Sequence, residues 1–268
     1  MLKIGIAGAR GLSAMTGFQS LPEVEVAALC DLNEELLDRE SKKYGIKKAF
    51  RVFEDMLADD IDAVVIATPM QLHVAQAIAA LQAGKHVLSE VTAGVSMEEL
   101  WWLVETVEQS GKVYMMAENY CYIPQVQLIQ NMVDQGLFGE VYFGEGEYLH
   151  ELKDLAFYQD GRVSWRSYWQ LGRRGNFYPT HSIGPVMNWM KNERIKSVIC
   201  QGSGWHTAPQ FRQEDTSITL CTTESGKLIK LRLDCLSERP HNLSYYSLQG
   251  TKGCYEAVSY THLRAHET

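Results

Sequence analysis

Short apolar runs alternate with amphipathic helical stretches over the first 120 residues, and this alternation restricts the possible fold more than any other feature. Strands are predicted at 2–7, 24–30, 63–67, 86–89 and 113–117, and helices at 11–21, from after Asp31 to Tyr44, at 74–83 and at 96–110. Short connections between the two kinds of element are typical of successive βαβ units. We therefore predict a doubly wound parallel sheet of the Rossmann type, which binds its ligand at the carboxyl ends of the strands.

The pattern changes after residue 120. A helix predicted at 124–135 is followed by β-rich runs at 141–150, 195–202, 216–223, 227–235 and 245–250, with one further helix near 182–191 and a hairpin turn at 223–226. Runs of this kind predict a C-terminal α+β domain with a mainly antiparallel open sheet. The chain is thus predicted to be an α/β protein with a nucleotide-binding domain at 1–120 and an α+β domain at 121–257.

The last eleven residues, 258–268, do not continue the strand pattern. They resemble the translated read-through of a common sequencing adapter, and a segment of this kind is excluded from fold reasoning. We expect the natural sequence to stop near Ala257, with a C-terminal part missing and the second sheet truncated.

Composition and charge exclude several classes of partner. Lys and Arg total 25 against 33 Asp and Glu, so the formal net charge of -8 disfavours nucleic acid as a partner. No apolar run is long enough for a membrane span, and a strand pattern starts at Leu2 without a signal peptide, so a cytoplasmic location is expected. The six cysteines form no C-x-x-C pair and are read as reduced core residues. The eight histidines show no metal-ligand spacing, so no metal site is predicted.

A glycine-rich turn joins the first predicted strand to the first predicted helix. Glycines here let the backbone approach a pyrophosphate, and Arg10 stands where the middle glycine of the usual pattern would be. Asp31 ends the second strand about 20 residues later, where a carboxylate can hold both ribose hydroxyls. Because Asp31 would repel a 2'-phosphate and the next two residues are not basic, NAD is favoured over NADP; the alternative is a merely solvated Asp31. The predicted cofactor-binding residues of this region are Gly8, Ala9, Arg10, Gly11 and Asp31.

Two further motifs carry a family resemblance. Ala67-Thr68-Pro69-Met-Gln-Leu-His73 and Gly84-Lys-His-Val-Leu-Ser-Glu90-Val91 are similar to the A-T-P-x-x-x-H and G-K-H-V-x-x-E-K-P motifs of the Gfo/Idh/MocA family. In dehydrogenases of this family the E-K-P lysine is a catalytic acid/base. Val91 occupies that position here and cannot titrate, which argues against an ordinary sugar dehydrogenase.

Additional strings narrow the resemblance to glycoside hydrolase family 109, the NAD-dependent α-N-acetylgalactosaminidases. These strings are the Glu90-Val91 pair, Glu118-Asn119, residues 144–150 and residues 175–185. The resemblance implies a redox-neutral hydrolysis in which tightly held NAD removes hydride from C3 of the sugar and the resulting ketone acidifies the C2 proton. Elimination of the aglycone, addition of water and return of the hydride complete the reaction.

The same resemblance implies roles for individual residues. Around the sugar it places four catalytic residues, Tyr148, His150, Tyr178 and His181, with Arg166 and Thr180 as substrate contacts. On the cofactor side it adds Thr68, Pro69, His73, Glu90, Val91 and Asn119. The residue pattern alone is also compatible with packing, since Tyr148 and His150 share one strand face and an aromatic group such as Trp165, Tyr168 and Trp169 fits either a sugar platform or a core.

The resulting hypothesis is an NAD-dependent glycosidase acting on N-acetylgalactosaminide-like sugars. Two alternatives remain open: an NAD-dependent sugar or inositol dehydrogenase of the same family, and a non-catalytic NAD-binding regulator. The expected partner is a small carbohydrate. The resemblance also implies a homo-oligomer that associates through the exposed face of the second sheet.

Overall fold

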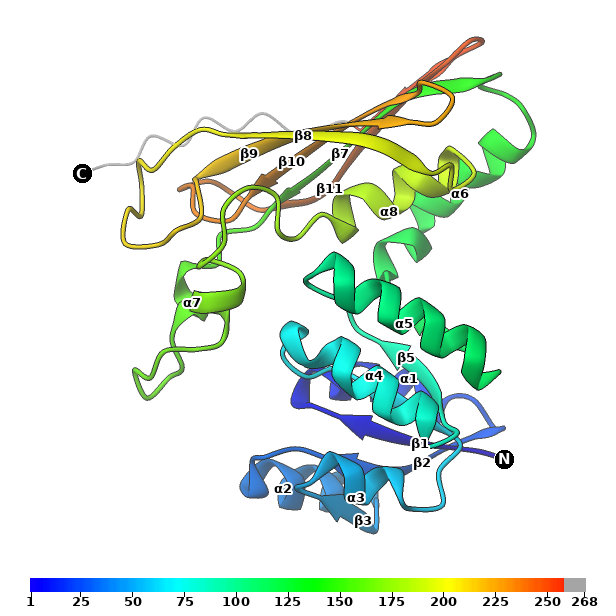
Figure 1. Cartoon of the computed structure of the whole chain (residues 1–268), viewed down its shortest axis with the longest axis vertical. Coiled ribbons are helices and arrows are strands. Elements are labelled where there is room, and N and C mark those ends of the chain that lie inside the picture. Colours follow the sequence, from blue (N-terminus) through cyan, green and yellow to red (C-terminus); the bar gives the residue numbers. More distant parts are fainter. Residues whose placement is uncertain (258–268) are drawn as a thin grey trace. The chain divides into compact units, whose positions relative to one another are not determined.

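A computed structural model describes residues 1–257 of the chain (Figure 1). It contains two compact units, Met1–Ala117 and a second unit that starts at Glu118. The prediction for residues 258–268 lies outside the described residues. Among the helices described, none is long and apolar enough to cross a membrane.

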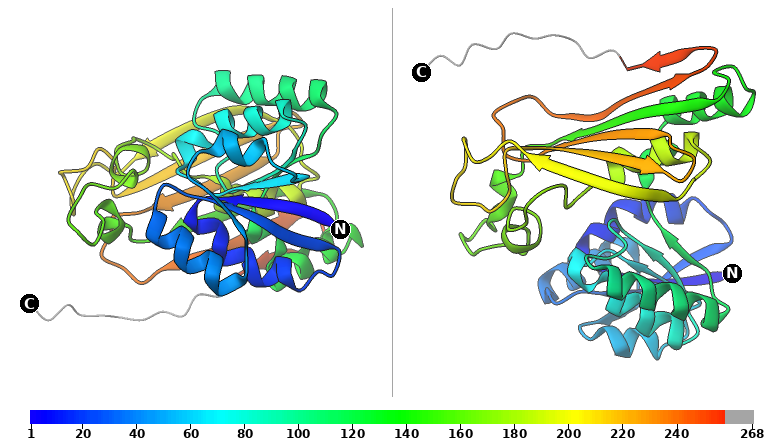
Figure 2. Two further views of the ribbon diagram at one scale, coloured as in Figure 1. Left: turned by 90° about the horizontal axis from the view of Figure 1, so that it is seen from below. Right: turned by 45° about the horizontal axis from the view of Figure 1, so that its top comes forward.

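The first unit is built on a six-stranded parallel sheet, seen with its flanking helices in the left view of Figure 2. Its strands are β1 (Leu2–Ala7), β2 (Val24–Cys30), β3 (Lys48–Phe50), β4 (Ala63–Ile66), β5 (His86–Ser89) and β6 (Tyr114–Met116). Their order is β3-β2-β1-β4-β5-β6, so the direction of winding reverses between β1 and β4. The prediction of a doubly wound parallel sheet is confirmed, and the reversal point is where such sheets bind ligands.

Helix ends in this unit follow local sequence signals. The helices are α1 (Met15–Gln19), α2 (Glu34–Tyr44), α3 (Phe53–Leu57), α4 (His73–Gln82) and α5 (Met97–Ser110), with 3-10 turns η1 (Ala9–Ala14) and η2 (Met70–Leu72). The Asn33 side chain caps α2, and Ser96 with Glu99 forms a capping box on α5. Gly45 and Gly111 end these two helices in the left-handed conformation.

The helix predicted at 11–21 differs in form. Residues Ala9–Ala14 form a 3-10 turn, and only Met15–Gln19 is α-helical. The reason lies in Gly11, which is buried so tightly that a Cβ would lie 2.6 Å from the Ile6 side chain. The chain therefore turns more tightly here than an α-helix allows, and Gly11 N–H donates to Gly8 O at 3.0 Å.

The second unit contains a six-stranded sheet with the order β12-β11-β7-β10-β9-β8. Its strands are β7 (Val141–Leu149), β8 (Ile195–Gly202), β9 (Thr216–Thr223), β10 (Leu228–Asp234), β11 (Asn242–Gly250) and β12 (Cys254–Glu256). All neighbours pair antiparallel except β7 and β10, which pair in parallel. The prediction of a mainly antiparallel second sheet is confirmed.

Helices cover one face of this sheet (Figure 2, right). They are α6 (Pro124–Asp134) and α8 (Thr180–Trp189), and the remaining short elements are α7 (Arg166–Trp169), η3 (Asn119–Tyr122) and η4 (Lys153–Ala156). Ile229, Leu231 and Leu233 alternate along β10 toward the core shared with these elements. The residues between them face the other way, and Lys230 pairs there with Glu145 at 2.5 Å. The open face and its edge strand β8 also expose apolar residues, with Ile199 71% exposed.

The cysteine prediction is partly wrong. Four cysteines are buried, but Cys200 and Cys254 are exposed, and all six are free thiols. Cys200 lies on β8, which is exposed along most of its length, and Cys254 lies on the three-residue edge strand β12. An edge strand covered on neither face leaves even an apolar-looking run in contact with solvent.

Candidate active site

The carboxyl end of β1 provides the close backbone approach that a dinucleotide site requires. Gly8 has φ +91°, and a Cβ at this residue would lie 2.4 Å from Ala67 O at the end of β4. Only glycine fits such a position. Gly8 N–H donates to Cys30 O at 2.9 Å, which draws the end of β2 to the same place, and Ala9 and Arg10 are exposed at the tip of this turn. These residues fit a bound dinucleotide at the sheet's reversal point.

Asp31 directly follows β2 and is half-buried. Its Oδ1 accepts a hydrogen bond from Asn33 N–H at 2.9 Å, so a local turn sets the direction of the carboxylate just before α2. A carboxylate at this point of the fold fits a contact with ribose hydroxyls.

His73 joins two loops at the same edge of the sheet. Its ring is 1% exposed, with Nδ1 2.8 Å from Thr92 O and Nε2 2.8 Å from Thr68 O. The imidazole thereby holds the segment after β4 against the segment after β5. Both ring nitrogens are engaged by backbone oxygens, so His73 serves the predicted cofactor edge by positioning loops rather than by reaching outward.

The remaining predicted cofactor-side residues occupy these loops. Thr68, Pro69 and Glu90 are half-buried, and Thr68 Oγ1 donates to Gln76 Oε1 at 2.5 Å. Val91 is 7% exposed and contributes an apolar side chain where dehydrogenases of the resembled family have a lysine. Asn119 is exposed in η3 and belongs to the second unit.

Imidazole and phenol groups gather in the second unit, where η3, β7, the loop before α8 and α8 itself meet. The structure brings together the four predicted catalytic residues and one residue that sequence reasoning missed: Tyr148, His150, Tyr178, His181 and Tyr120. The rings of Tyr120 and His181 stack with centroids 4.1 Å apart. The ring centroids of Tyr148 and Tyr178 lie 5.1 and 5.3 Å from that of His181.

His181 is paired with Glu118, which the sequence analysis named only as part of the family resemblance and gave no role. His181 Nδ1 lies 2.8 Å from Glu118 Oε1, and both residues are buried. Gly184, one turn along α8, permits this approach, because a Cβ there would lie 2.8 Å from Glu118 Cγ. An ionised carboxylate only accepts hydrogen bonds, so Nδ1 carries the proton and Nε2 is left as the basic nitrogen. Glu118 Oε2 is buried and has no hydrogen-bond partner among the described residues.

Tyr148 and His150 form a second linked pair. Tyr148 Oη lies 2.6 Å from His150 Nδ1, and the His150 ring has an edge contact with the ring of His241, centroid to centroid 4.6 Å. Burial raises the pKa of Tyr148 above its ordinary value. Burial, together with the charges of His241 and Arg166, lowers the pKa of His150 to about 4. At neutral pH the phenol is therefore protonated and donates to a neutral imidazole.

The two predicted substrate contacts differ in their surroundings. Arg166 begins α7 and donates from Nη1 to Gln170 Oε1 at 2.7 Å. Its charge offsets part of the rise in the pKa of Tyr148 and adds to the lowering of the pKa of His150. Thr180 is buried at the start of α8, and its Oγ1 has no hydrogen-bond partner within residues 1–257. Arg166 therefore acts electrostatically on the Tyr148–His150 pair, and Thr180 is next to His181.

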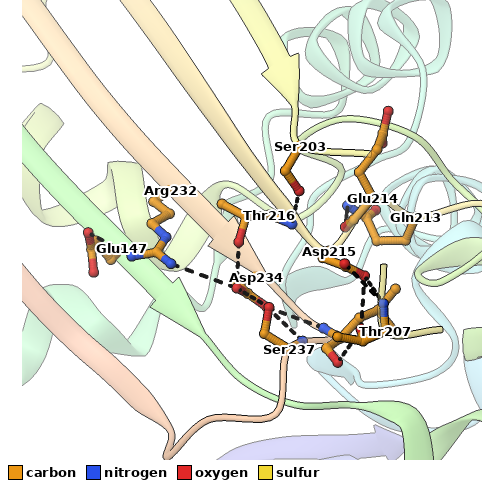
Figure 3. Close-up of polar contacts among 11 residues, drawn as sticks. Glu147, Ser203, Thr207, Gln213, Glu214, Asp215, Thr216, Arg232, Asp234 and Ser237 are labelled. Carbon is orange, nitrogen blue, oxygen red and sulfur yellow. Dashed lines mark hydrogen bonds and ion pairs between the residues drawn. The ribbon is translucent and has the colours of Figure 1, made fainter. Parts of the chain in front are cut away.

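Buried polar contacts surround Asp234 and Asp215 (Figure 3). Asp234, at the end of β10, is 2% exposed and accepts from Thr216 Oγ1 at 2.5 Å and from Ser237 Oγ at 2.7 Å. The Asp234 carbonyl oxygen accepts from His150 N–H at 2.8 Å. Asp215 closes the neighbouring loop by accepting from the Thr207 hydroxyl at 2.9 Å. These carboxylates hold loop ends in place, and no group of three or more His, Cys, Asp or Glu residues in the described chain is arranged to hold a metal.

The low pKa of His150 predicts a pH-dependent loss of stability. In the unfolded chain His150 takes up a proton near pH 6.5, whereas in the folded chain it does so only near pH 4. Between these values the unfolded state binds more protons, so the free energy of unfolding falls as the pH falls from 6.5 to 4. After discounting for partial solvent exposure, the loss is about 1–2 kcal/mol.

Urea unfolding of the wild type and of His150→Gln at pH 7 and pH 4.5 measures this effect. The wild type should lose more stability than the variant over this interval. Carboxylates that titrate in the same range are common to both proteins, so the difference isolates His150. Equal losses in the two proteins would show that His150 does not carry the effect.

Comparison with known proteins gives two family matches along the chain. Residues 2–118 match the model of the oxidoreductase family with an NAD-binding Rossmann fold, GFO_IDH_MocA. Residues 122–206 match the glycosyl hydrolase 109 C-terminal domain.

Relatives and solved structures agree with these matches. A glycosyl hydrolase family 109 protein of Saccharopolyspora erythraea is 33% identical, and the alignment covers 95% of this chain and 62% of the relative. A protein of Shewanella oneidensis named alpha-N-acetylgalactosaminidase is 34% identical over 94% of this chain and 61% of its own length. The chain therefore spans about three-fifths of the length of these relatives. The structure of scyllo-inositol dehydrogenase from Lactobacillus casei with bound NAD(H) and scyllo-inositol has a TM-score of 0.81, with 21% identity, and covers 100% of this chain and 80% of that one.

Proposed function

We propose that this chain is an NAD-dependent glycosidase, because its residues 2–118 match the Gfo/Idh/MocA oxidoreductase family and its residues 122–206 match the glycosyl hydrolase 109 C-terminal domain. The proposed substrates are glycosides of N-acetylgalactosamine-like sugars, as the name of the Shewanella oneidensis relative indicates for that protein. The observation that carries the proposal is the buried Glu118–His181 pair surrounded by three tyrosine rings. NAD is the cofactor, in keeping with the NAD-binding Rossmann family of the first unit.

The pairing of His181 gives it the properties of a general base. Glu118 holds the Nδ1 proton, so the Nε2 lone pair can accept a proton from a sugar carbon or hydroxyl. When His181 becomes protonated, the buried Glu118 carboxylate stabilises the new charge. The stacked Tyr120 ring and the hydrogen bond from Tyr246 Oη to His181 O hold the imidazole and its backbone in one orientation.

The Tyr148–His150 pair can move a proton between a sugar hydroxyl and solvent. The Tyr148 phenol can accept the hydroxyl proton while it gives its own proton to His150 Nδ1, so no phenolate accumulates. This route suits a phenol whose burial raises its pKa, because a free phenolate would be costly there. His150 in turn touches His241, which is exposed to solvent.

When bound, NAD supplies a reversible hydride acceptor for the sugar carbon that carries the hydroxyl. The chain's own residues then have two tasks: Tyr148 and His150 take and return the hydroxyl proton, and His181 removes the proton on the neighbouring carbon. Arg166 adds a positive charge beside Tyr148 that stabilises negative charge developing on the sugar oxygen.

A single pair of assays tests the proposal. Protein loaded with NAD is incubated with a chromogenic N-acetyl-α-galactosaminide in deuterated water, and aglycone release, reduced cofactor and deuterium at C2 of the product are followed. We expect release without net accumulation of reduced cofactor and with deuterium at C2, because the C2 proton exchanges during the reaction.

The two alternatives give different results in the same assays. Stoichiometric reduction of added NAD by free sugar, without glycoside cleavage, would identify a sugar or inositol dehydrogenase and overturn the proposal. NAD binding without either reaction would identify a non-catalytic regulator. Val91 favours the glycosidase over the dehydrogenase, because a buried valine cannot replace the acid/base lysine of such dehydrogenases.

Association and location complete the proposal. Exposed apolar residues on the second sheet, among them Ile199 and Leu220, support self-association through the open face of that sheet. A cytoplasmic location stays a prediction from the sequence.

A further inference from the structure

A pocket lies around α7 in the second unit. This pocket of about 380 Å3 is lined by residues 167–169, 172–173 and 210–212. This volume lies within the range of small-molecule sites in proteins. None of its lining residues is acidic.

The pocket carries two arginine side chains in a chain whose net charge is -8. Arg173 and Arg212 are both exposed, and neither is paired with a carboxylate in the part of the chain that the structure describes. Neighbouring arginines in this unit are different: Arg174 is paired with Glu214 at 3.1 Å and Arg162 with Asp160 at 2.7 Å. Two guanidinium groups at one pocket without acidic partners attract an anionic ligand.

The walls of the pocket are tied to one another by backbone hydrogen bonds. The carbonyl oxygen of Leu171, a fully buried residue, accepts from Arg212 N–H and from Gln213 N–H, both at 3.0 Å. Ser167 Oγ donates to Ala156 O at 2.6 Å and fixes α7 from the other side. These hydrogen bonds fix the backbone of both walls, which lowers the entropic cost of binding.

Aromatic side chains give the pocket apolar surface and order one of its arginines. The Arg173 guanidinium lies over the Trp169 ring, 4.3 Å from its centroid, which holds the charge in place. Tyr168 is 64% exposed, and Phe211 also lines the pocket. A ring with an apolar face and an anionic substituent fits this combination, and Ser167 and Gln210 add polar groups for hydroxyls.

We propose that the α7 pocket binds a sugar unit that carries a carboxylate, with Arg173 and Arg212 on the carboxylate and Tyr168 and Phe211 along the ring. Arg166, at the first position of the same four-residue helix, acts on Tyr148 and His150 in the candidate active site. The pocket and the candidate active site thus share this short helix, and the inference that one glycan occupies both rests on the proposed function. The substrate class that follows is a glycoside whose aglycone contains an acidic sugar.

Direct binding tests the pocket without any turnover. Calorimetric titration of the NAD-loaded protein compares methyl β-D-glucuronide with methyl β-D-glucoside, which differ only in the carboxylate. We expect binding of the glucuronide, at least tenfold weaker binding of the glucoside, and at least a tenfold loss of glucuronide affinity in Arg173→Gln and in Arg212→Gln. The matched control is Arg194→Gln, which removes the same charge from an exposed pair with Glu224 in the same unit and should leave the affinity unchanged.

Two results would overturn the inference. One is equal binding of the charged and neutral glycosides, or binding that neither arginine variant weakens. The other is displacement of the glucuronide by inorganic sulfate with an affinity equal to that of the glucuronide, since this would show an anion site without sugar recognition. The titration is repeated with His181→Ala. If this variant still binds the glucuronide but no longer hydrolyses glycosides, the pocket and the glycosidase activity can be judged separately, so that failure of one proposal is not mistaken for failure of the other.

Discussion

Replacing His181 by Ala is expected to lower the turnover number for glycoside hydrolysis by about 10^2- to 10^4-fold, the usual contribution of a positioned general base. The imidazole is the group that Glu118 polarises, and no other described histidine has its ring hydrogen-bonded to a buried carboxylate. NAD binding should remain, because the residues that fit the cofactor at the sheet's reversal point lie in the first unit. Steady-state kinetics and cofactor titration of the same preparation measure both quantities.

His206→Ala is the matched control, since His206 is exposed and, among the described residues, its ring bonds to Ser203 O and its backbone N–H to Asp215. It should keep wild-type turnover. The turnover number of Glu118→Gln should lie between those of His181→Ala and His206→Ala. The amide retains the shape of the side chain but not the charge that stabilises protonated His181. Wild-type turnover in His181→Ala would remove this residue from the reaction.

The largest expected effect on stability comes from Gly146→Ala. A Cβ on Gly146 would lie 2.0 Å from Ser182 O, so β7 and α8 touch there through their backbones. A backbone contact cannot relax by turning a side chain, so the free energy of unfolding should fall by about 3 kcal/mol or more. Because Ser182 follows His181 on α8, the same displacement would move His181 relative to Glu118 and reduce activity.

Gly253→Ala is the control in the same unit. The nearest atom to a Cβ on Gly253 would be Phe138 Cδ1 at 3.6 Å, an ordinary contact, and its φ lies outside the left-handed region. Denaturant unfolding should show a change below about 1 kcal/mol for Gly253→Ala. A Gly146→Ala protein as stable as this control would mean that β7 and α8 are not in backbone contact.

Elements with strong local signals were predictable from the sequence. The capping box at Ser96 and Glu99 marks the start of α5, and strict alternation along β10 marks both its position and its buried face. β3 and β12 have three residues each, which is too short for alternation to be read. The tight turn of η1 depends on packing of Gly11 against distant side chains, which no local pattern reports.

The candidate site was predictable only in part. A resemblance to a known family indicated Tyr148, His150, Tyr178 and His181, and the structure brings these four together. Their partners were missed because pairing is set by the fold: Glu118 and His181 are 63 residues apart in the sequence. The α7 pocket was missed for the same reason, since Arg212 reaches it through the hydrogen bond of its N–H to Leu171 O.

The parallel pairing of β7 with β10 also bears on how the second unit reaches its native state. Lys230 and Glu145, which face each other across these strands, are separated by 85 residues, and no short turn can join two parallel strands. Contacts of such long range close late, because the entropy lost by the intervening chain must be offset first. During synthesis on the ribosome, the hydrogen bond from His150 N–H to Asp234 O can therefore form only after β10 has left the ribosome. The first unit can fold before that point.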